Sequence, residues 1–366
     1  MNRPAACQAR QRGSWLALIR IQPGIKPPNL GSYSLPHLYR AFGLEVDSDD
    51  LELPELAPLD PPAPTEPAAP GNARIRILYE PASQWPAVSE APPSHCHSDG
   101  RHSLWIGPEE LRLRIWDVGD FRILGGQQIG WCPANPGVSP AELRMYLLGS
   151  AFGALLIQRG LLVLHGNALE REGRAIVCLG ASGAGKSTLA CALMQQGWRL
   201  LADDLVAITP EGMVLPGIPR IKLWEDALRC FGWSPEHWIP VATGMAKYVM
   251  PADQLRPSPA PARLAQLYLL RREPWNGHRP LQRQAIGSEQ GAMAELLNQL
   301  FRPTFVEGLG RQGTSFLALA RLLRQAPLTT LVLPDTINDL IEVLTATELI
   351  PHQPVTSTQL PLESPT

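Results

Sequence analysis

One short segment constrains this chain more than any other. Residues 180–188 read Gly-Ala-Ser-Gly-Ala-Gly-Lys-Ser-Thr and contain the pattern G-x-x-x-x-G-K-[ST]. Glycines at these spacings let consecutive backbone N–H groups turn inward and form a cradle for phosphate oxygens. An apolar strand is expected before the segment at 175–179, and a helix after it at 186–196 adds positive charge from its N-terminus. The sequence therefore predicts a nucleoside triphosphate site on this turn.

The residues of the segment have separate expected roles. Lys186 should reach the β and γ phosphates of the nucleotide, and the Ser187 hydroxyl is placed to ligate Mg²⁺. We therefore expect ATP and Mg²⁺ as cofactors. The other cofactor-binding residues of the segment are expected to be Gly180, Ala181, Ser182, Gly183, Ala184, Gly185 and Thr188.

Lysine is scarce in this chain. Of 32 Lys and Arg residues only four are Lys, at positions 26, 186, 222 and 247. The three late lysines stand out for that reason. Codon bias and chance nevertheless explain any single one of them better than function does, except Lys186.

Two adjacent carboxylates, Asp203 and Asp204, follow the expected helix. A strand directly after that helix would deliver them near the strand end, where phosphates bind in open α/β sheets. Because neighbouring residues on a strand point to opposite sides, we expect the two to have different roles. One can accept a proton from an incoming hydroxyl, and the other can hold Mg²⁺. The structural alternative is an Asp-Asp pair that only starts a turn.

A histidine precedes the glycine-rich segment. Leu164-His165-Gly166 is expected to end a strand that neighbours the strand at 175–179. A lone histidine is more often structural than catalytic. Its position at a strand end beside the phosphate site leaves both interpretations open.

Together these segments resemble the HPr kinase/phosphorylase family, and more closely its divergent HPr kinase-like bacterial members. The resemblance rests on 164–166, on 180–188 and on Gly197-Trp-Arg-Leu-Leu-Ala-Asp-Asp204, and it covers about 139–344. It implies an α/β fold with a P-loop core of the phosphoenolpyruvate carboxykinase/HPr kinase type. It also implies transfer of phosphate to a serine hydroxyl.

The same resemblance assigns roles to individual residues. Asp203 would be the general base, Asp204 its neighbour on the metal or phosphate side, and His165 the active-site histidine. Lys247 resembles a basic position that follows the core in the divergent relatives, and by this resemblance it would contact the phosphates or the acceptor. Family members assemble as hexamers, so the resemblance is compatible with a homo-oligomer.

The chain departs from the family at one motif. The HPr kinases carry a glycine-rich signature with a Glu and an Arg after the core, and the only similar string here, 307–311, lies far downstream. HPr itself is therefore not the expected substrate, and phosphorolysis is expected still less.

We expect a mostly-β N-terminal domain at 1–135, with a Pro-rich linker or loop near 58–71, and a P-loop kinase-like domain at 136–351. A flexible tail is expected at 352–366. Strands in the first half are predicted by alternation of apolar and polar residues at 73–79, 111–116 and 121–124. A helix should begin at the capping box Ser139–Glu142 and stop at Gly160.

Beyond that helix, strands and helices alternate, which is typical of an α/β nucleotide-binding core. The further strands are predicted at 161–164, 198–202, 205–208, 264–270 and 328–333, and the further helices at 289–301, 315–324 and 335–344.

Composition excludes several classes of protein. A formal net charge of −2 argues against a nucleic-acid binder. No apolar run reaches the roughly 18 residues of a membrane span, and no secretory signal is evident, so we expect a cytoplasmic protein of bacterial type. His95, Cys96, His97 and His102 lie in a loop rich in Pro and Ser, and a solvated loop is favoured over a metal site there.

The function expected from the sequence is an ATP-dependent kinase whose acceptor is a hydroxyl of a peptide, a protein or a small molecule. The alternatives are a small-metabolite kinase and a non-catalytic ATP-sensing regulator. Trp224, Trp233 and Trp238 could line an acceptor groove, although ordinary packing is favoured for them.

Overall fold

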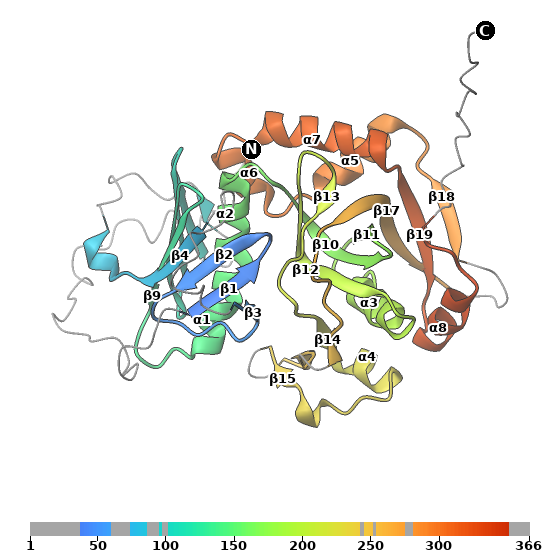
Figure 1. Ribbon diagram of the computed structural model, residues 1–366, viewed down its shortest axis with the longest axis horizontal. Helices are drawn as coiled ribbons and strands as arrows, with labels where there is room; N and C mark the ends of the chain where they lie inside the picture. Colours follow the sequence, from blue (N-terminus) through green and yellow to red (C-terminus); the bar gives the residue numbers. More distant parts are fainter. Residues whose placement is uncertain are drawn as a thin grey trace, which may run out of the picture. The chain divides into compact units, whose positions relative to one another are not determined.

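The computed structural model describes residues 37–59, 74–85, 95–96, 102–241, 245–251, 254–274 and 281–350. Every described residue belongs to one compact unit, Leu35–Thr366. The fold is a mixed α/β structure with two large sheets and one small one (Figure 1). The predicted tail at 352–366 and most of the predicted loop at 58–71 lie outside the described residues.

The first half of the described chain forms a nine-stranded sheet. The strands predicted at 73–79, 111–116 and 121–124 are present. Their alternating pattern has its expected cause, because Leu111 and Leu113 are buried while Arg112 between them is not. The strand order is β3 (Ala57–Pro58), β1 (His37–Ala41), β2 (Leu44–Ser48), β4 (Arg74–Tyr79), β9 (Gln128–Pro133), β8 (Gly119–Leu124), β7 (Glu110–Ile115), β6 (His102–Ile106) and β5 (His95–Cys96). A short 3₁₀ helix, η1, covers Ala82–Gln84.

Three consecutive helical segments follow the nine-stranded sheet: α1 (Pro140–Tyr146), a π-helical turn η2 (Leu147–Ala151) and α2 (Phe152–Gln158). The predicted capping box is confirmed, since Ser139 accepts from the Glu142 backbone N–H and the Glu142 carboxylate accepts in return. Gly160 then takes a φ of +79°, which suits the end of the helical run. Apolar side chains of these helices share one buried core with the nine-stranded sheet.

The second half contains a seven-stranded sheet. Its order is β11 (Arg174–Leu179), β10 (Leu162–Arg171), β12 (Arg199–Ile208), β13 (Met213–Val214), β17 (Ala262–Glu273), β19 (Leu328–Pro334) and β18 (Gln282–Ala285). β11 also pairs in parallel with β17, so the first five strands in this order close into a ring. The expectation that the strand carrying His165 neighbours the strand before the glycine-rich turn is confirmed, since β10 pairs with β11.

Helices pack on two sides of this sheet (Figure 1). One buried cluster joins it to α3 (Lys186–Gln195) and α8 (Ile337–Thr345), and another joins it to α5 (Glu289–Asn298) and α7 (Gln312–Gln325). The helix predicted at 289–301 ends three residues early, and Pro303 begins a separate helix, α6 (Pro303–Gly308). The predicted boundary between 135 and 136 falls between β9 and α1 and stays a prediction.

A small third sheet lies next to α4 (Glu225–Cys230). It consists of β14 (Lys222–Trp224), β16 (Lys247–Val249) and β15 (Ile239–Pro240), in that order, with the 3₁₀ helix η3 at Pro235–His237. None of the described helices combines the length and the apolar character that crossing a membrane requires.

Candidate active site

A cavity of about 600 Å³ lies where the glycine-rich turn, β12, the three-stranded sheet and the start of α8 meet. Pockets of this size take nucleotide-sized ligands. The elements that contribute are far apart in sequence. Its lining residues are His165, Ser182, Gly183, Gly185, Lys186, Ser187, Thr188, Asp204, Lys222, Leu223, Trp224, Asp226, Ala227, Cys230, Lys247, Arg272, Asp335, Thr336, Ile337 and Asn338.

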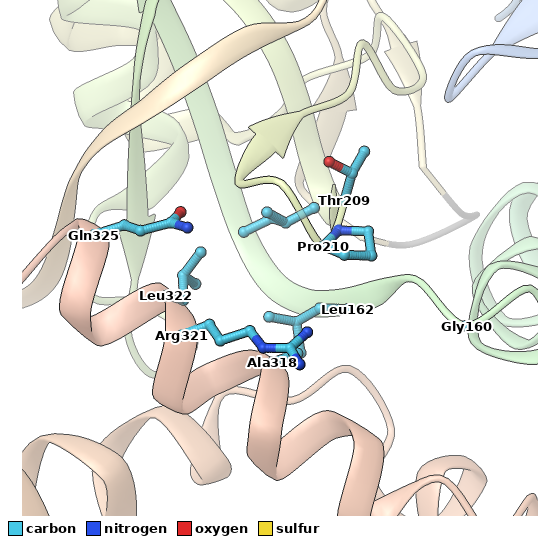
Figure 2. A pocket seen from close by; sticks show the side chains of 9 residues that line it. Gly160, Leu162, Thr209, Pro210, Ala318, Arg321, Leu322 and Gln325 are labelled. Atoms are coloured by element: carbon cyan, nitrogen blue, oxygen red, sulfur yellow. The ribbon is translucent and has the colours of Figure 1, made fainter.

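A second cavity lies beside α7 and is much smaller. Figure 2 shows Leu162, Thr209 and Pro210 around it, facing Arg321 and Gln325 of the helix. Its volume is about 30 Å³, which is room for water and not for a nucleotide. Of these two cavities, only the larger has room for a nucleotide-sized ligand.

The glycine-rich turn adopts a backbone that its glycines make accessible. Gly180, Gly183 and Gly185 have φ values of +141°, +84° and +96°. A side chain at Gly180 would also crowd the backbone, because an added Cβ would lie 3.1 Å from the Leu270 carbonyl oxygen. The turn leads directly into α3, so backbone N–H groups at a helix N-terminus line the cavity.

Lys186 begins α3 and lines the cavity. Its Nζ donates to the carbonyl oxygens of Gly180 at 2.6 Å and Ala181 at 3.1 Å. Burial lowers its pKa, while the nearby Asp203 and Asp204 carboxylates act in the opposite direction. Gly180, Ala181 and Ala184, also predicted as cofactor-binding, do not line the cavity themselves.

The two adjacent carboxylates lie in the middle of β12 and not at its end. The segments predicted at 198–202 and 205–208 are one strand, so the expected strand end at Asp203 was wrong. Asp204 has a left-handed φ of +66°, which interrupts the strand's regular alternation. The expectation that neighbouring strand residues point to opposite sides of the sheet therefore does not apply to Asp203 and Asp204. A further irregularity lies just upstream, where β12 carries an extra residue at Leu201 opposite β10.

The environments of the two carboxylates differ sharply. Burial, and then the negative charge of Asp204, raises the pKa of Asp203 to about 7. Asp204 forms an ion pair with Lys222, with 2.6 Å between Oδ2 and Nζ, and cations around it hold its pKa at about 2 against the effect of burial. Asp203 does not line the cavity, but its carboxylate interacts with Lys222 and Lys247, which do.

His165 lines the cavity from β10. The prediction that it ends a strand was wrong, since β10 continues to Arg171. Gly166 is a position of close approach, because an added Cβ would lie 2.6 Å from the Cys178 carbonyl oxygen on β11. Burial and the charge of Lys186 lower the pKa of His165, so its imidazole is neutral at neutral pH.

Lys247 lines the cavity from β16, and its ammonium lies 5.5 Å from the ring centroid of Trp224. The three tryptophans divide between the two roles considered for them. Trp238 is buried and lies 5.5 Å from Trp233, centroid to centroid, which is core packing. Trp224 also lines the cavity and is 52% exposed.

Sequence reasoning assigned no role to several residues of the site. Lys222, Arg272 and the first residues of α8 line the cavity, and only the scarcity of lysine pointed to Lys222. Asn167 is fully buried on β10, pairs in register with Asp203, and neither its amide nitrogen nor its amide oxygen has a hydrogen-bond partner. A polar residue inside an apolar strand was its only signal.

The donor set fits Mg²⁺. The Ser187 hydroxyl and the Asp204 carboxylate both line the cavity, and the latter is ionised at neutral pH. Both are hard oxygen donors, which Mg²⁺ prefers. Within the described residues, no three His, Cys, Asp or Glu side chains gather as a metal site. Mg²⁺ at a phosphate site is commonly held by one or two side chains together with phosphates and water. His97, from the predicted loop cluster, lies outside the described residues.

No family model and no curated protein matches the chain. Among solved structures, the chain is similar to the Hpr(Ser) kinase/phosphatase from Coxiella burnetii, with 13% identity and a TM-score of 0.25. The match covers 50% of this chain and 94% of that one. At this TM-score the likeness has no weight for fold or function.

Proposed function

We propose that this protein is an ATP-dependent kinase that transfers the γ-phosphoryl group of Mg-ATP to a hydroxyl. A serine of a peptide or protein is the proposed acceptor. One observation carries the proposal: the glycine-rich turn with Lys186 and, from a separate segment, Asp204 line one nucleotide-sized cavity, and the charge of Asp203 acts on Lys186 there. His165 lies at the same cavity.

The binding half of the reaction falls to the turn and to α3. Backbone N–H groups of the turn and the Lys186 ammonium would hold the phosphates, while Ser187 and Asp204 would hold Mg²⁺. When bound, Mg²⁺ supplies positive charge that offsets the charge on the phosphate oxygens. Lys247, which lines the cavity, would contact the phosphates or the acceptor.

The transfer half falls to Asp203. The acceptor oxygen forms a bond to the γ phosphorus as the bond from that phosphorus to the β–γ bridging oxygen breaks. The proton of the acceptor hydroxyl passes to the Asp203 carboxylate, and ADP leaves with the bridging oxygen. The neutral imidazole of His165, which lines the same cavity, would orient the reacting groups.

The experiment that tests this function follows ADP release and phosphate transfer from Mg-ATP, with and without free serine and serine-containing peptides. Transfer to one acceptor class, abolished in Asp203→Asn, is the expected result. Tight ATP binding without ADP formation under any condition would replace the kinase with a nucleotide-sensing protein. Transfer to free serine but to no peptide would point to a small-metabolite kinase.

A further inference from the structure

Lys222 is the one cavity lysine with an ion-pair partner among the described residues. It lies on β14, its side chain is 15% exposed, and its Nζ is 2.6 Å from Asp204 Oδ2. Lys186 and Lys247 line the same cavity and have no carboxylate within ion-pair distance in the described part of the chain. Three of the four lysines of the whole sequence therefore gather at one cavity.

The ammonium of Lys222 is not saturated. A lysine has three N–H donors, and the structure gives Lys222 one hydrogen bond in its described part, to Asp204. The remaining donors belong to a largely buried cation that lines the cavity. Charged N–H donors that have no protein partner within the described residues, in a site largely shielded from solvent, suit the oxygens of a phosphoryl group.

Lys222 reaches the site from a different sheet. Lys186 and Asp204 belong to the seven-stranded sheet and its helix, whereas β14 belongs to the three-stranded sheet. Lys222 can therefore contact the transferred group from a segment that is separate from the phosphate-binding turn.

We propose that Lys222 is a catalytic residue that contacts the phosphoryl group during transfer, a role that rests on the kinase function proposed above. Its ammonium pairs with Asp204 before nucleotide binds. With nucleotide bound, it donates to the oxygens of the group moving from the β–γ bridging oxygen to the acceptor. Lys222 exchanges no proton in this step, because the acceptor proton goes to Asp203.

A purely structural role is the competing explanation, since the ion pair also ties the three-stranded sheet to β12. Loss of a structural tie would weaken every nucleotide complex alike. Loss of a contact to the transferred group would weaken only complexes that contain that group or its mimic. The two explanations therefore differ in a measurable way.

The test measures binding of Mg-ADP, and of Mg-ADP with aluminium fluoride as a mimic of the transferring group, by calorimetry on the full chain. The affinity of Lys222→Met for ADP should stay within about threefold of the wild-type affinity. Its affinity for the mimic should fall about 100-fold, the size of effect expected when one hydrogen-bond donor to a transition-state charge is removed. The matched control is Arg229→Met on α4, whose exposed guanidinium pairs with Glu225. It should bind both ligands as wild type does.

An equal loss of affinity for ADP and for the mimic, or no loss of affinity for either, would overturn the role of Lys222. If Lys222→Met does not fold, Lys222→Arg provides the same comparison. Arginine keeps the positive charge but changes the geometry of the charged group. The affinity of this variant should fall about tenfold for the mimic and stay unchanged for ADP. The role would also be overturned if Lys222→Arg bound both ligands with wild-type affinity, or if its affinity fell equally for both. Wild type that binds no ADP would refute the proposed kinase itself, which is a separate result.

Discussion

The two large sheets handle their cations differently. In the nine-stranded sheet, arginines pair across strands with carboxylates, as Arg114 does with Asp120 at 2.7 Å and Arg122 with Glu110 at 2.9 Å. At the cavity of the seven-stranded sheet, Lys186, Lys247 and Arg272 have no ion-pair partner among the described residues. Paired charges contribute to a stable surface, whereas unpaired charges around a cavity are available to an anionic ligand.

The two sheets also differ in backbone regularity, as a comparison of β12 at the candidate site with β7 and β8 shows. Asp204 holds a left-handed φ of +66° inside a strand, a conformation that costs an aspartate of order 1 kcal/mol or more. Asn167, buried on the neighbouring strand, has an amide without partners. By contrast, β7 and β8 pair regularly over six residue pairs. The surroundings of the two carboxylates thus depart from the regular pairing of β7 with β8.

The largest expected effect comes from Asp203→Asn. It removes the proton acceptor and leaves the phosphate-binding turn intact, so the transfer rate should fall by about 10³-fold while ATP affinity stays within a few-fold. Asp120→Asn in the nine-stranded sheet is the matched control, and its transfer rate should equal that of wild type. Equal transfer rates for Asp203→Asn and wild type would remove the general-base assignment.

Next in size is a change in the core of the nine-stranded sheet. Phe121 is fully buried on β8, so Phe121→Ala should lower the free energy of unfolding by about 3–5 kcal/mol. Denaturant unfolding measures the loss. Below the unfolding transition the variant should bind ATP like wild type. Loss of ATP binding by folded Phe121→Ala would show that the two sheets are not separable in function.

Lys186→Met should weaken ATP binding by about 10- to 100-fold, as expected for the loss of charged hydrogen bonds to phosphate. Calorimetry with Mg-ATP measures it. Arg263→Met removes an exposed cation from β17 of the same sheet, and its affinity should not change. Unchanged ATP affinity in Lys186→Met would contradict the phosphate-binding role of the turn.

The smallest effect is expected for Arg76→Met, which breaks an exposed ion pair with Asp49. Their side chains are 57% and 35% exposed, so solvent screens the pair and the free energy of unfolding should change by less than about 1 kcal/mol. A loss above about 2 kcal/mol, measured by denaturant unfolding at moderate salt, would mean that the cations of this sheet matter more than their exposure implies.

Local patterns predicted most elements of the fold because they depend on nearby residues. The capping box at Ser139, the alternation of β7 and the turn before Lys186 are of this kind. Long-range pairing was out of reach. Gly166 resembles a strand end in sequence, and only the close approach of β11 shows why glycine lies inside β10.

The candidate site shows the same limit. Its central turn and carboxylates were predicted as a set, and the structure lines one cavity with part of the turn and with Asp204, whereas Asp203 does not line it. Lys222 and Arg272 were not assigned, because their approach depends on how β14 and β17 fold against the turn. The left-handed conformation of Asp204 had no signal in the sequence either.

The most direct measurement is a crystal structure with Mg²⁺ and a non-hydrolysable ATP analogue. The account predicts phosphate oxygens within about 3 Å of the backbone N–H groups of 180–188 and of Lys186 Nζ, with the γ phosphate toward Asp203. A nucleotide bound elsewhere, or one whose γ phosphate points away from Asp203, would contradict it.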